Sequence, residues 1–244
     1  MNAAHDDHAS AHGMPGGLAI SSGGYTLSAA PTLFEPGRQE EFSVQILDEA
    51  GREVRGLVEQ HSQRMHQIVV RRDLIYYQHL HPSLSENGSW TVAFTLPEAG
   101  VYRAFADFMV DGVPLTLGVD LTAEGDLRFV PLPDPTNNAY AEDDYEVVLD
   151  AGTPTVGAEN VLGFRVRREG GEFENLEPYL GALGHLVALR EEDLAYLHVH
   201  PTGGTGSRIG FRAAFPSLGR YRLFLQFAHE RQVRTAAFTV DVRP

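Results

Sequence analysis

Six of the 11 histidines of this chain fall into two triads with identical spacing. His66, His79 and His81 recur as His185, His198 and His200, each displaced by 119 residues. Neutral imidazole nitrogens are ordinary ligands of zinc, copper, iron and nickel ions in proteins. Three imidazoles that converge on one point therefore predict a metal site, and we expect one such site in each half of the chain.

The histidine triads lie within a longer repeat, which identifies the chain as a tandem duplication. Read without gaps, residues 66–108 and 185–227 share 12 identical positions out of 43. The shared positions include arginine, proline, glycine and aromatic residues as well as the histidines. An interpretation of one triad must therefore also account for the other.

Composition excludes several classes of function. The chain has 244 residues, a formal net charge of −14 and no cysteine. The negative charge disfavours nucleic acid and anionic membranes as partners, and no apolar run reaches the ~20 residues that a membrane-spanning helix needs. The lack of cysteine excludes disulfides, thiolate nucleophiles and cysteine-ligated metal centres. A transition-metal site here must use histidine, methionine, carboxylate or amide ligands.

The spacing of apolar runs predicts an all-β protein built from two tandem immunoglobulin-like β-sandwich domains. Short alternating or apolar runs are separated by Gly, Pro and Asn about every 8–12 residues, and no helical periodicity persists. In both copies a segment from proline to tyrosine, 97–102 and 216–221, resembles the tyrosine corner of immunoglobulin-like sandwiches.

Changes in composition predict four segments. We expect a flexible His/Gly/Ala-rich tail over 1–24, a first domain over 25–124, a Pro-rich linker over 125–143 and a second domain over 144–244. The tail lacks the basic region and the apolar stretch of a signal peptide, and we expect a mature or trimmed form of the protein.

A β-hairpin would bring the members of each triad onto one face of a sheet. In the first copy, a turn at Arg72-Asp73 would place His66 directly opposite His79, and His81 would share their face. The second copy would repeat this arrangement around Glu191-Glu192. The same parity places eight further residues on the histidine faces, where we expect them to belong to the domain cores, with each triad at the rim of a core. They are Ile68, Val70, Ile75, Tyr77, Val187, Leu189, Leu194 and Tyr196.

Other residues are weaker candidates for the site. Met65 precedes His66 but has a glycine as its counterpart in the second copy, so it would serve the first site alone or pack in a core. Asp107 aligns with Gln226, as a polar fourth ligand position or as an exposed strand residue. No nucleophile elbow, phosphate loop or dinucleotide fingerprint is present, so we expect no enzyme.

The histidine motifs resemble those of a known group. Met65-His66, His79-Leu80-His81-Pro82, the segment from Pro178 to His185, and His198-Val199-His200-Pro201 look like bacterial extracytoplasmic YtkA-like, copper-associated metal-binding proteins in their two-module form. The resemblance implies a secreted or periplasmic location and the binding of copper or another soft-to-borderline metal. It implies six ligands: His66, His79, His81, His185, His198 and His200.

We therefore expect an extracytoplasmic metal-binding protein for metal storage, delivery or resistance. Copper is the first expectation and zinc the second, because three neutral imidazoles suit both ions and intrinsic affinity favours copper. The alternative is a non-catalytic two-domain interaction or structural module, whose histidines are core hydrogen-bonding residues and whose partner is another extracytoplasmic protein. A metal-dependent hydrolase or oxidase is a third, weaker hypothesis.

Overall fold

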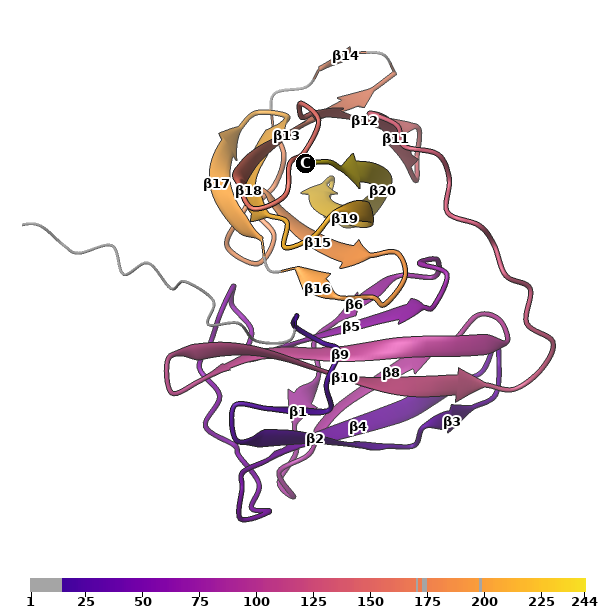
Figure 1. Cartoon of the computed structure of the whole chain (residues 1–244), viewed down its shortest axis with the longest axis vertical. Helices are drawn as coiled ribbons and strands as arrows, with labels where there is room; N and C mark the ends of the chain where they lie inside the picture. The colour runs from indigo at the N-terminus through magenta and orange to yellow at the C-terminus, as the bar shows by residue number, and fades with distance from the viewer. Residues whose placement is uncertain (1–14, 170, 173–174, 198) are drawn as a thin grey trace, which may run out of the picture.

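The computed structural model describes residues 15–169, 171–172, 175–197 and 199–244, which consist of strands and loops without a helix. The strands form four sheets, two from each half of the chain (Figure 1). Within the described residues, no helix has the length and apolar character needed to cross a membrane. The prediction of an all-β chain with two tandem sandwich domains is confirmed.

The first domain contains ten described strands in two sheets. Their bounds are Ser21–Ser22 (β1), Tyr25–Ala30 (β2), Leu33–Phe34 (β3), Gln39–Leu47 (β4), Met65–Arg71 (β5), Gln78–Leu80 (β6), Ser83–Leu84 (β7), Trp90–Thr95 (β8), Gly100–Val110 (β9) and Val113–Ala123 (β10). One sheet has the order β1-β2-β4-β8-β7 and the other β3-β10-β9-β5-β6. Neighbouring strands are antiparallel except β3 and β10, which are parallel.

The second domain repeats this two-sheet arrangement. Its described strands are Asn138–Ala141 (β11), Tyr145–Asp150 (β12), Glu159–Arg168 (β13), Gly171–Glu172 (β14), Gly184–Arg190 (β15), Tyr196–Leu197 (β16), His200–Thr205 (β17), Arg208–Ala214 (β18), Gly219–His229 (β19) and Gln232–Val242 (β20). One sheet has the order β11-β12-β13-β18-β17, with β14 beside β13, and the other β16-β15-β19-β20.

Both domains contain the predicted tyrosine corner. The hydroxyl of Tyr102 donates to the carbonyl of Glu98 at 2.8 Å, and the hydroxyl of Tyr221 donates to the carbonyl of Ser217 at 3.2 Å. Both tyrosines are fully buried, so each bond fixes the loop that precedes β9 or β19. The pair of packed sheets and this corner identify both domains as immunoglobulin-like sandwiches.

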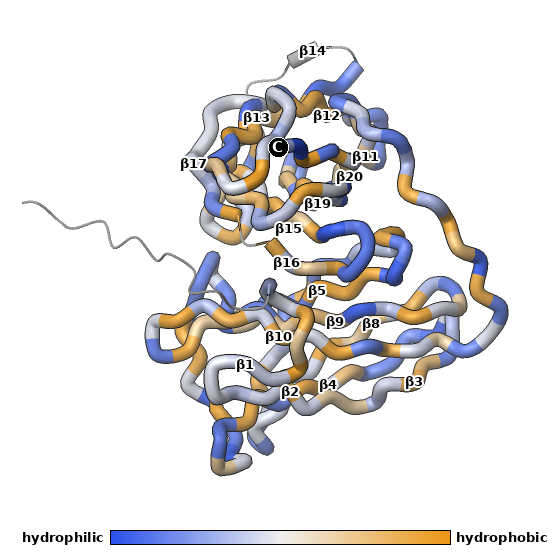
Figure 2. Tube along the Cα trace, viewed as in Figure 1, coloured by the Kyte–Doolittle hydropathy of each residue, from blue (hydrophilic) through white to orange (hydrophobic). Residues whose placement is uncertain are grey.

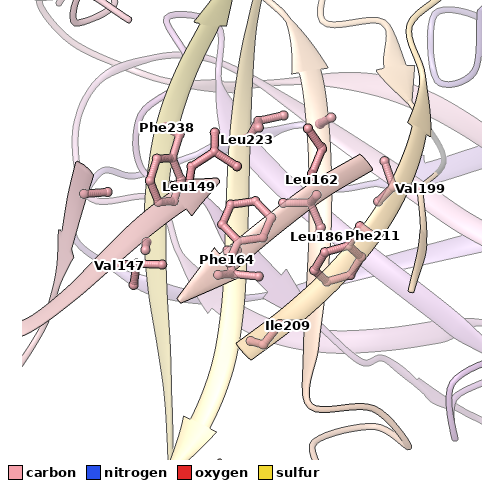
Figure 3. Packing of buried hydrophobic residues seen from close by; sticks show 14 of the residues in the cluster. Val147, Leu149, Leu162, Phe164, Leu186, Val199, Ile209, Phe211, Leu223 and Phe238 are labelled. Carbon is pink, nitrogen blue, oxygen red and sulfur yellow. The ribbon is translucent and has the colours of Figure 1, made fainter. Parts of the chain in front are cut away.

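Each sandwich encloses its own apolar core. From Phe42 onward, strand β4 alternates between buried and partly buried side chains, as expected for a strand with one face on a core. In the second domain, the ring of Phe164 contacts those of Phe211 and Phe238, with centroids 5.9 Å and 5.4 Å apart (Figure 3). These cores hold each pair of sheets together independently of the other domain.

A third apolar core lies between the two domains. Every residue of β5 is buried, so this strand is covered on both faces. Met65 and Val69 point into the core of the first domain, whereas Ile68 and Val70 contribute to a separate cluster with residues of the second domain. Figure 2 shows hydrophobic residues in both domains where β5 and β16 face each other.

The contact between the domains has an approximate twofold symmetry that follows the 119-residue repeat. The ring of Tyr77 stacks on that of Phe224, with centroids 4.2 Å apart. The equivalent pair, Tyr196 and Phe105, has its centroids 5.5 Å apart. The tyrosine of each domain therefore contacts the equivalent phenylalanine of the other domain. Such reciprocal pairs are the property of an isologous contact between identical subunits.

This contact corrects the prediction for the histidine faces. Ile68, Val70, Val187 and Leu189 are buried, but in the core between the domains rather than in the core of their own domain. His66 and His185 lie on the outer faces of their sheets, and each of these faces is covered by the other domain. The sequence pattern of a strand buried on two faces does not reveal which face belongs to which core.

The predicted register of the histidine hairpins is wrong by two residues. The structure pairs Ile68 with His79 and Gln67 with Leu80, so His66 is not directly opposite His79. The turn is wider than two residues, because the chain takes left-handed conformations at Leu74 (φ 62°) and Tyr76 (φ 55°) before β6 begins. A shift of two preserves the face of every side chain, so the predicted face is correct.

The N-terminal segment after residue 14 is part of the fold rather than a tail. The Gly17 amide donates to the Thr116 carbonyl of β10 at 2.8 Å, and the Tyr196 amide of β16 donates to the Gly16 carbonyl at 2.9 Å. Gly118 allows this close approach, because a Cβ there would lie 2.1 Å from the Gly17 carbonyl oxygen. The first 14 residues of the predicted tail lie outside the described residues.

The segment between the domains is hydrogen-bonded to both of them. The guanidinium of Arg71 donates to the Arg128 carbonyl at 2.9 Å, and that of Arg220 donates to the Pro133 carbonyl at 2.6 Å. The expected linker, 125–143, also contains β11, which pairs with β12 of the second domain. The connection in Figure 1 is therefore a strap held along one side of the domain pair.

The core between the domains should contribute strongly to stability. We expect Phe224→Ala to lower the free energy of unfolding by about 3–5 kcal/mol, because it removes a buried ring from the contact with Tyr77. Phe129→Ala, at a ring that is 68% exposed, should change it by less than about 0.5 kcal/mol. Urea unfolding followed by circular dichroism measures both, and equal effects would contradict this view of the interface.

Candidate functional site: an imidazole cluster between the domains

Strands β5 and β6 bring the first triad together. His66 lies in β5, His79 in β6, and His81 directly after the end of β6. One ring nitrogen of each lies within 4.8 Å of those of the other two. In the part of the chain that the structure describes, no other group of three His, Asp or Glu side chains brings its ligand atoms so close. The hairpin therefore produces the convergence that its spacing predicts.

A series of close polar contacts runs through two of these histidines and crosses the domain boundary. The Nε2 of His66 lies 3.1 Å from the carbonyl oxygen of Gln60, and its Nδ1 lies 2.9 Å from the Nε2 of His79. The Nδ1 of His79 lies 2.7 Å from the Oε1 of Gln226, a residue of β19 in the second domain. The Gln226 amide nitrogen donates to the Thr235 hydroxyl at 3.3 Å, which points its oxygen toward His79.

This series of contacts ends at an acceptor on each side, which determines which ring nitrogens carry the imidazole protons. The Gln60 carbonyl and the Gln226 Oε1 only accept, so the outer nitrogens of His66 and His79 must carry the protons. In two neutral rings the inner nitrogens, 2.9 Å apart, then both carry lone pairs. This pair of facing acceptors is satisfied only by a third proton or by a cation between them.

Burial disfavours the extra proton. It lowers the pKa of His66 to about 4, although the bond to Gln60 and the charge of Asp107 act in the opposite direction. Burial, together with repulsion from His66 and His81, holds the pKa of His79 well below its usual value of 6.5. The pKa of His81 is also lowered by burial, and its Nε2 is buried without a hydrogen-bond partner in the protein. The triad is therefore neutral near pH 7, the form in which imidazole binds metal ions.

The second domain contributes one histidine to the same cluster. The Nε2 of His185 donates to the Tyr179 carbonyl at 2.8 Å, which repeats the bond between His66 and Gln60 with the 119-residue offset. The ring centroid of His185 lies 5.3 Å from that of His61 and 6.3 Å from that of His79. His185 thus faces the first triad across the domain boundary.

The second triad does not repeat the arrangement of the first. His200 is exposed and begins β17, which pairs with β18 in the other sheet of the second domain. His198 lies outside the described residues. In the first domain β6 keeps its place beside β5 as far as Leu80, whereas β16 ends at Leu197. The chain changes sheets earlier in the second copy, so His200 lies in a different sheet from His185.

A small cavity between the domains adjoins the cluster. It has a volume of about 50 Å³, and its polar lining comes from His61, His66, His79, Asp107 and His185. Apolar side chains of the second domain, including Val187 and Phe211, complete the wall. A space of this size accommodates an ion or a water molecule, whereas pockets for organic ligands measure about 300–1,000 Å³.

The structure also places the weaker candidates. Met65 is buried in the core of the first domain, on the face of β5 opposite to His66. Asp107 and Gln226 are buried polar residues in β9 and β19, next to β5 and β15, and both adjoin the cluster. The carboxylate of Asp107 accepts a hydrogen bond from the Thr116 hydroxyl at 2.8 Å. His229 lies apart from the cluster, with its Nδ1 2.6 Å from the hydroxyl of Tyr145.

Two contributions to the cluster were missed by reasoning from sequence. The alignment of Asp107 with Gln226 marked both positions as polar, but it did not show that Gln226 reaches a histidine of the other domain. The Gln60 carbonyl reaches His66 because residues 60–63 form a tight turn, with left-handed φ values of 48° at His61 and 63° at Ser62. A backbone acceptor leaves no signal in residue types.

Comparison with known proteins supports the duplication. Each half of the chain matches the sequence pattern of a domain of unknown function, DUF8832, over residues 20–125 and 139–244. No curated protein sequence matches the chain.

Several solved structures resemble this chain, with low sequence identity and low TM-scores. FdeC, an Escherichia coli adhesin, has 15% sequence identity and a TM-score of 0.32, with 92% of this chain and 65% of that chain covered. InvD of Yersinia pseudotuberculosis has 14% identity and a TM-score of 0.31, with 92% and 59% covered. Domains 4 and 5 of the S-layer protein SbsC have 12% identity and a TM-score of 0.28, with 93% and 100% covered. The chain therefore spans less than two thirds of the FdeC and InvD chains.

The lowered pKa values predict a dependence of stability on pH in the metal-free protein. Unfolding returns His66 to a pKa near 6.5, so between pH 6.5 and about 4 the unfolded state binds more protons. Stability should therefore fall with falling pH in this window, by on the order of 3 kcal/mol from His66.

Urea unfolding in the presence of a chelator measures this effect. His66→Gln keeps a donor for the Gln60 carbonyl and should lose that part of the slope, whereas His200→Gln, at an exposed position, should keep it. A His66 imidazole that titrates near pH 6.5 in NMR spectra of the folded protein would contradict the assignment.

Proposed function

We propose that this chain, which belongs to the family of the domain of unknown function DUF8832 and carries two copies of that domain, binds one transition-metal ion through His66, His79 and His81. The two-domain sandwich is the frame of the site, and the proposed role is non-catalytic. Metal storage, delivery or resistance in an extracytoplasmic compartment is part of the same proposal.

The facing lone pairs of His66 and His79 carry this proposal. Their nitrogens lie 2.9 Å apart, and two nitrogens that bind one ion at about 2.0–2.1 Å are separated by about 2.9–3.4 Å. Each ring also donates its other N–H to an oxygen acceptor, as metal-binding histidines almost always do. His81 supplies a third ring nitrogen within 4.8 Å of theirs, and its buried Nε2 has no hydrogen-bond partner in the protein.

The ligand chemistry favours copper(II), with zinc(II) second. Neutral imidazoles suit both ions, and the intrinsic order of affinities places copper(II) above zinc(II). Soft ligands that would select copper(I) are missing from the cluster, since the chain has no cysteine and Met65 points into the domain core. A cluster of imidazoles beside one carboxylate, Asp107, therefore fits a divalent ion.

A second candidate is a structural or interaction module in which the same histidines only hold the domains together. The observation that favours it is the hydrogen bond from His79 to Gln226, which crosses the domain boundary, within an interface already supported by an apolar core. In this module one proton, shared by His66 and His79, would replace the ion. The two candidates differ in whether the protein takes up metal.

Metal titration separates the candidates. A protein whose tail histidines His5, His8 and His12 are replaced by alanine should bind one equivalent of copper(II) or zinc(II) at pH 7, with a higher Tm. His79→Ala should weaken binding by more than about 100-fold, because outer-shell partners alone are worth about 10- to 100-fold. The matched control, His200→Ala, should bind normally.

Calorimetry and elemental analysis measure the stoichiometry. A protein that takes up neither metal, or in which His79→Ala and His200→Ala bind alike, would leave the structural module as the better account.

The affinity should depend only weakly on pH near neutrality. Unperturbed imidazoles, with a pKa of about 6.5, would lose metal steeply between pH 7 and 5. Because burial lowers the pKa of His66 to about 4 and of His79 well below 6.5, protons compete only at lower pH. We expect the affinity to change by less than about 10-fold between pH 7 and 5, measured by competition with a chelator. A steep loss in this range would show that the histidines titrate normally.

A further inference from the structure

We propose that the second domain completes the metal site, with His185 as a fourth ligand, so that the bound ion ties the two sandwiches together. This inference rests on the proposed function, and it adds a ligand and a mechanical consequence to it. The duplication alone suggested two separate sites, one per domain. The geometry points to one shared site for each chain.

The twofold relation of the domains places His66 and His185 at equivalent positions of β5 and β15, on opposite walls of one cavity. The ring of His185 is 6.3 Å from that of His79, centroid to centroid. Asp107 of the first domain lines the same cavity and adds a carboxylate to it. The cavity is therefore bounded by potential ligands from both domains.

His185 is prepared for ligation in the same way as His66. Its Nε2 donates to the Tyr179 carbonyl at 2.8 Å, which places the proton on that nitrogen and leaves the lone pair on Nδ1. Burial lowers the pKa of His185, so the ring is neutral near pH 7. The hydrogen bond also fixes the ring orientation, as outer-shell partners of metal-binding histidines do.

Ligation by His185 requires a movement, and that movement couples the ion to the domains. The nitrogens of the first triad lie within 4.8 Å of one another, and His185 is not part of that group. Because the bond to Tyr179 holds the ring, a slight approach of the two domains would bring Nδ1 to the ion. An ion that binds the closed pair better than the open pair shifts the equilibrium toward closure by that difference.

The second domain already supports the site through another residue. Gln226 accepts the Nδ1 proton of His79 at 2.7 Å, so it selects the tautomer that offers Nε2 to an ion. Opening the interface would remove this acceptor and His185 together. The proposed site is thus intact only when the two sandwiches are in contact.

The first experiment measures affinity in the full chain with alanines at His5, His8 and His12. His185→Gln keeps a donor for the Tyr179 carbonyl but has no ring nitrogen, and we expect it to weaken copper(II) and zinc(II) binding by at least about 10-fold. His200→Gln, an exposed position in the same domain, is the matched control and should bind like the parent protein.

The second experiment measures closure by amide hydrogen exchange. The Tyr196 amide donates to the Gly16 carbonyl, which joins β16 of the second domain to the segment that pairs with β10 of the first. Saturating zinc(II) should slow its exchange at least about 10-fold in the parent protein. In His185→Gln, saturated with the same ion, this added protection should disappear.

A direct probe needs no variant. With an NMR-active cadmium isotope bound to the parent protein, scalar coupling should connect the metal to a ring nitrogen of His185 as well as to those of the first triad. Equal affinity and protection in His185→Gln, or coupling restricted to His66, His79 and His81, would overturn the shared site but leave metal binding by the first domain intact. A parent protein that binds no metal would refute both.

Discussion

The packing of one sheet from each sandwich against the other is the interaction on which the rest of the structure depends. It buries Ile68, Val70, Val187 and Leu189 on faces that solvent would cover in a single domain. It also makes β5 a strand buried on both faces, which is unusual outside parallel sheets. The aromatic pairs at its centre follow the internal repeat, so the contact is that of a symmetric dimer joined into one chain.

This contact changes the environment of the histidines. On the outer face of an isolated sandwich they would be solvated and would titrate normally. Each is covered by the other domain and therefore desolvated, and burial lowers the pKa values of His66, His79 and His185 below 6.5. Desolvation alone would be costly for these polar rings, but each has an oxygen acceptor for one N–H: Gln60, Gln226 and Tyr179. The inner nitrogens remain available to a cation.

The sequence was sufficient for the features that depend on periodicity and local pattern. Alternation gave the strands, the 119-residue repeat gave two similar domains, and parity gave the common face of His66, His79 and His81. Register failed because the turn after Arg71 includes left-handed residues at Leu74 and Tyr76, which residue types do not announce. The position of His185 was not predictable either, because it depends on how two separately folded sandwiches dock.

The two copies differ where a single shared site would require it. A twofold axis brings equivalent histidines to one cavity from opposite sides, so two complete triads there would place six imidazoles around a space of about 50 Å³. In the second copy the chain passes to the other sheet at β17, which contains His200. His185 of that copy faces the first triad. At the paired position in β9 and β19, Asp107 provides negative charge beside His66, while Gln226 provides a neutral acceptor for His79. Asp107 and Gln226 therefore make the two domains contribute differently to the cluster, as one asymmetric site between similar domains requires.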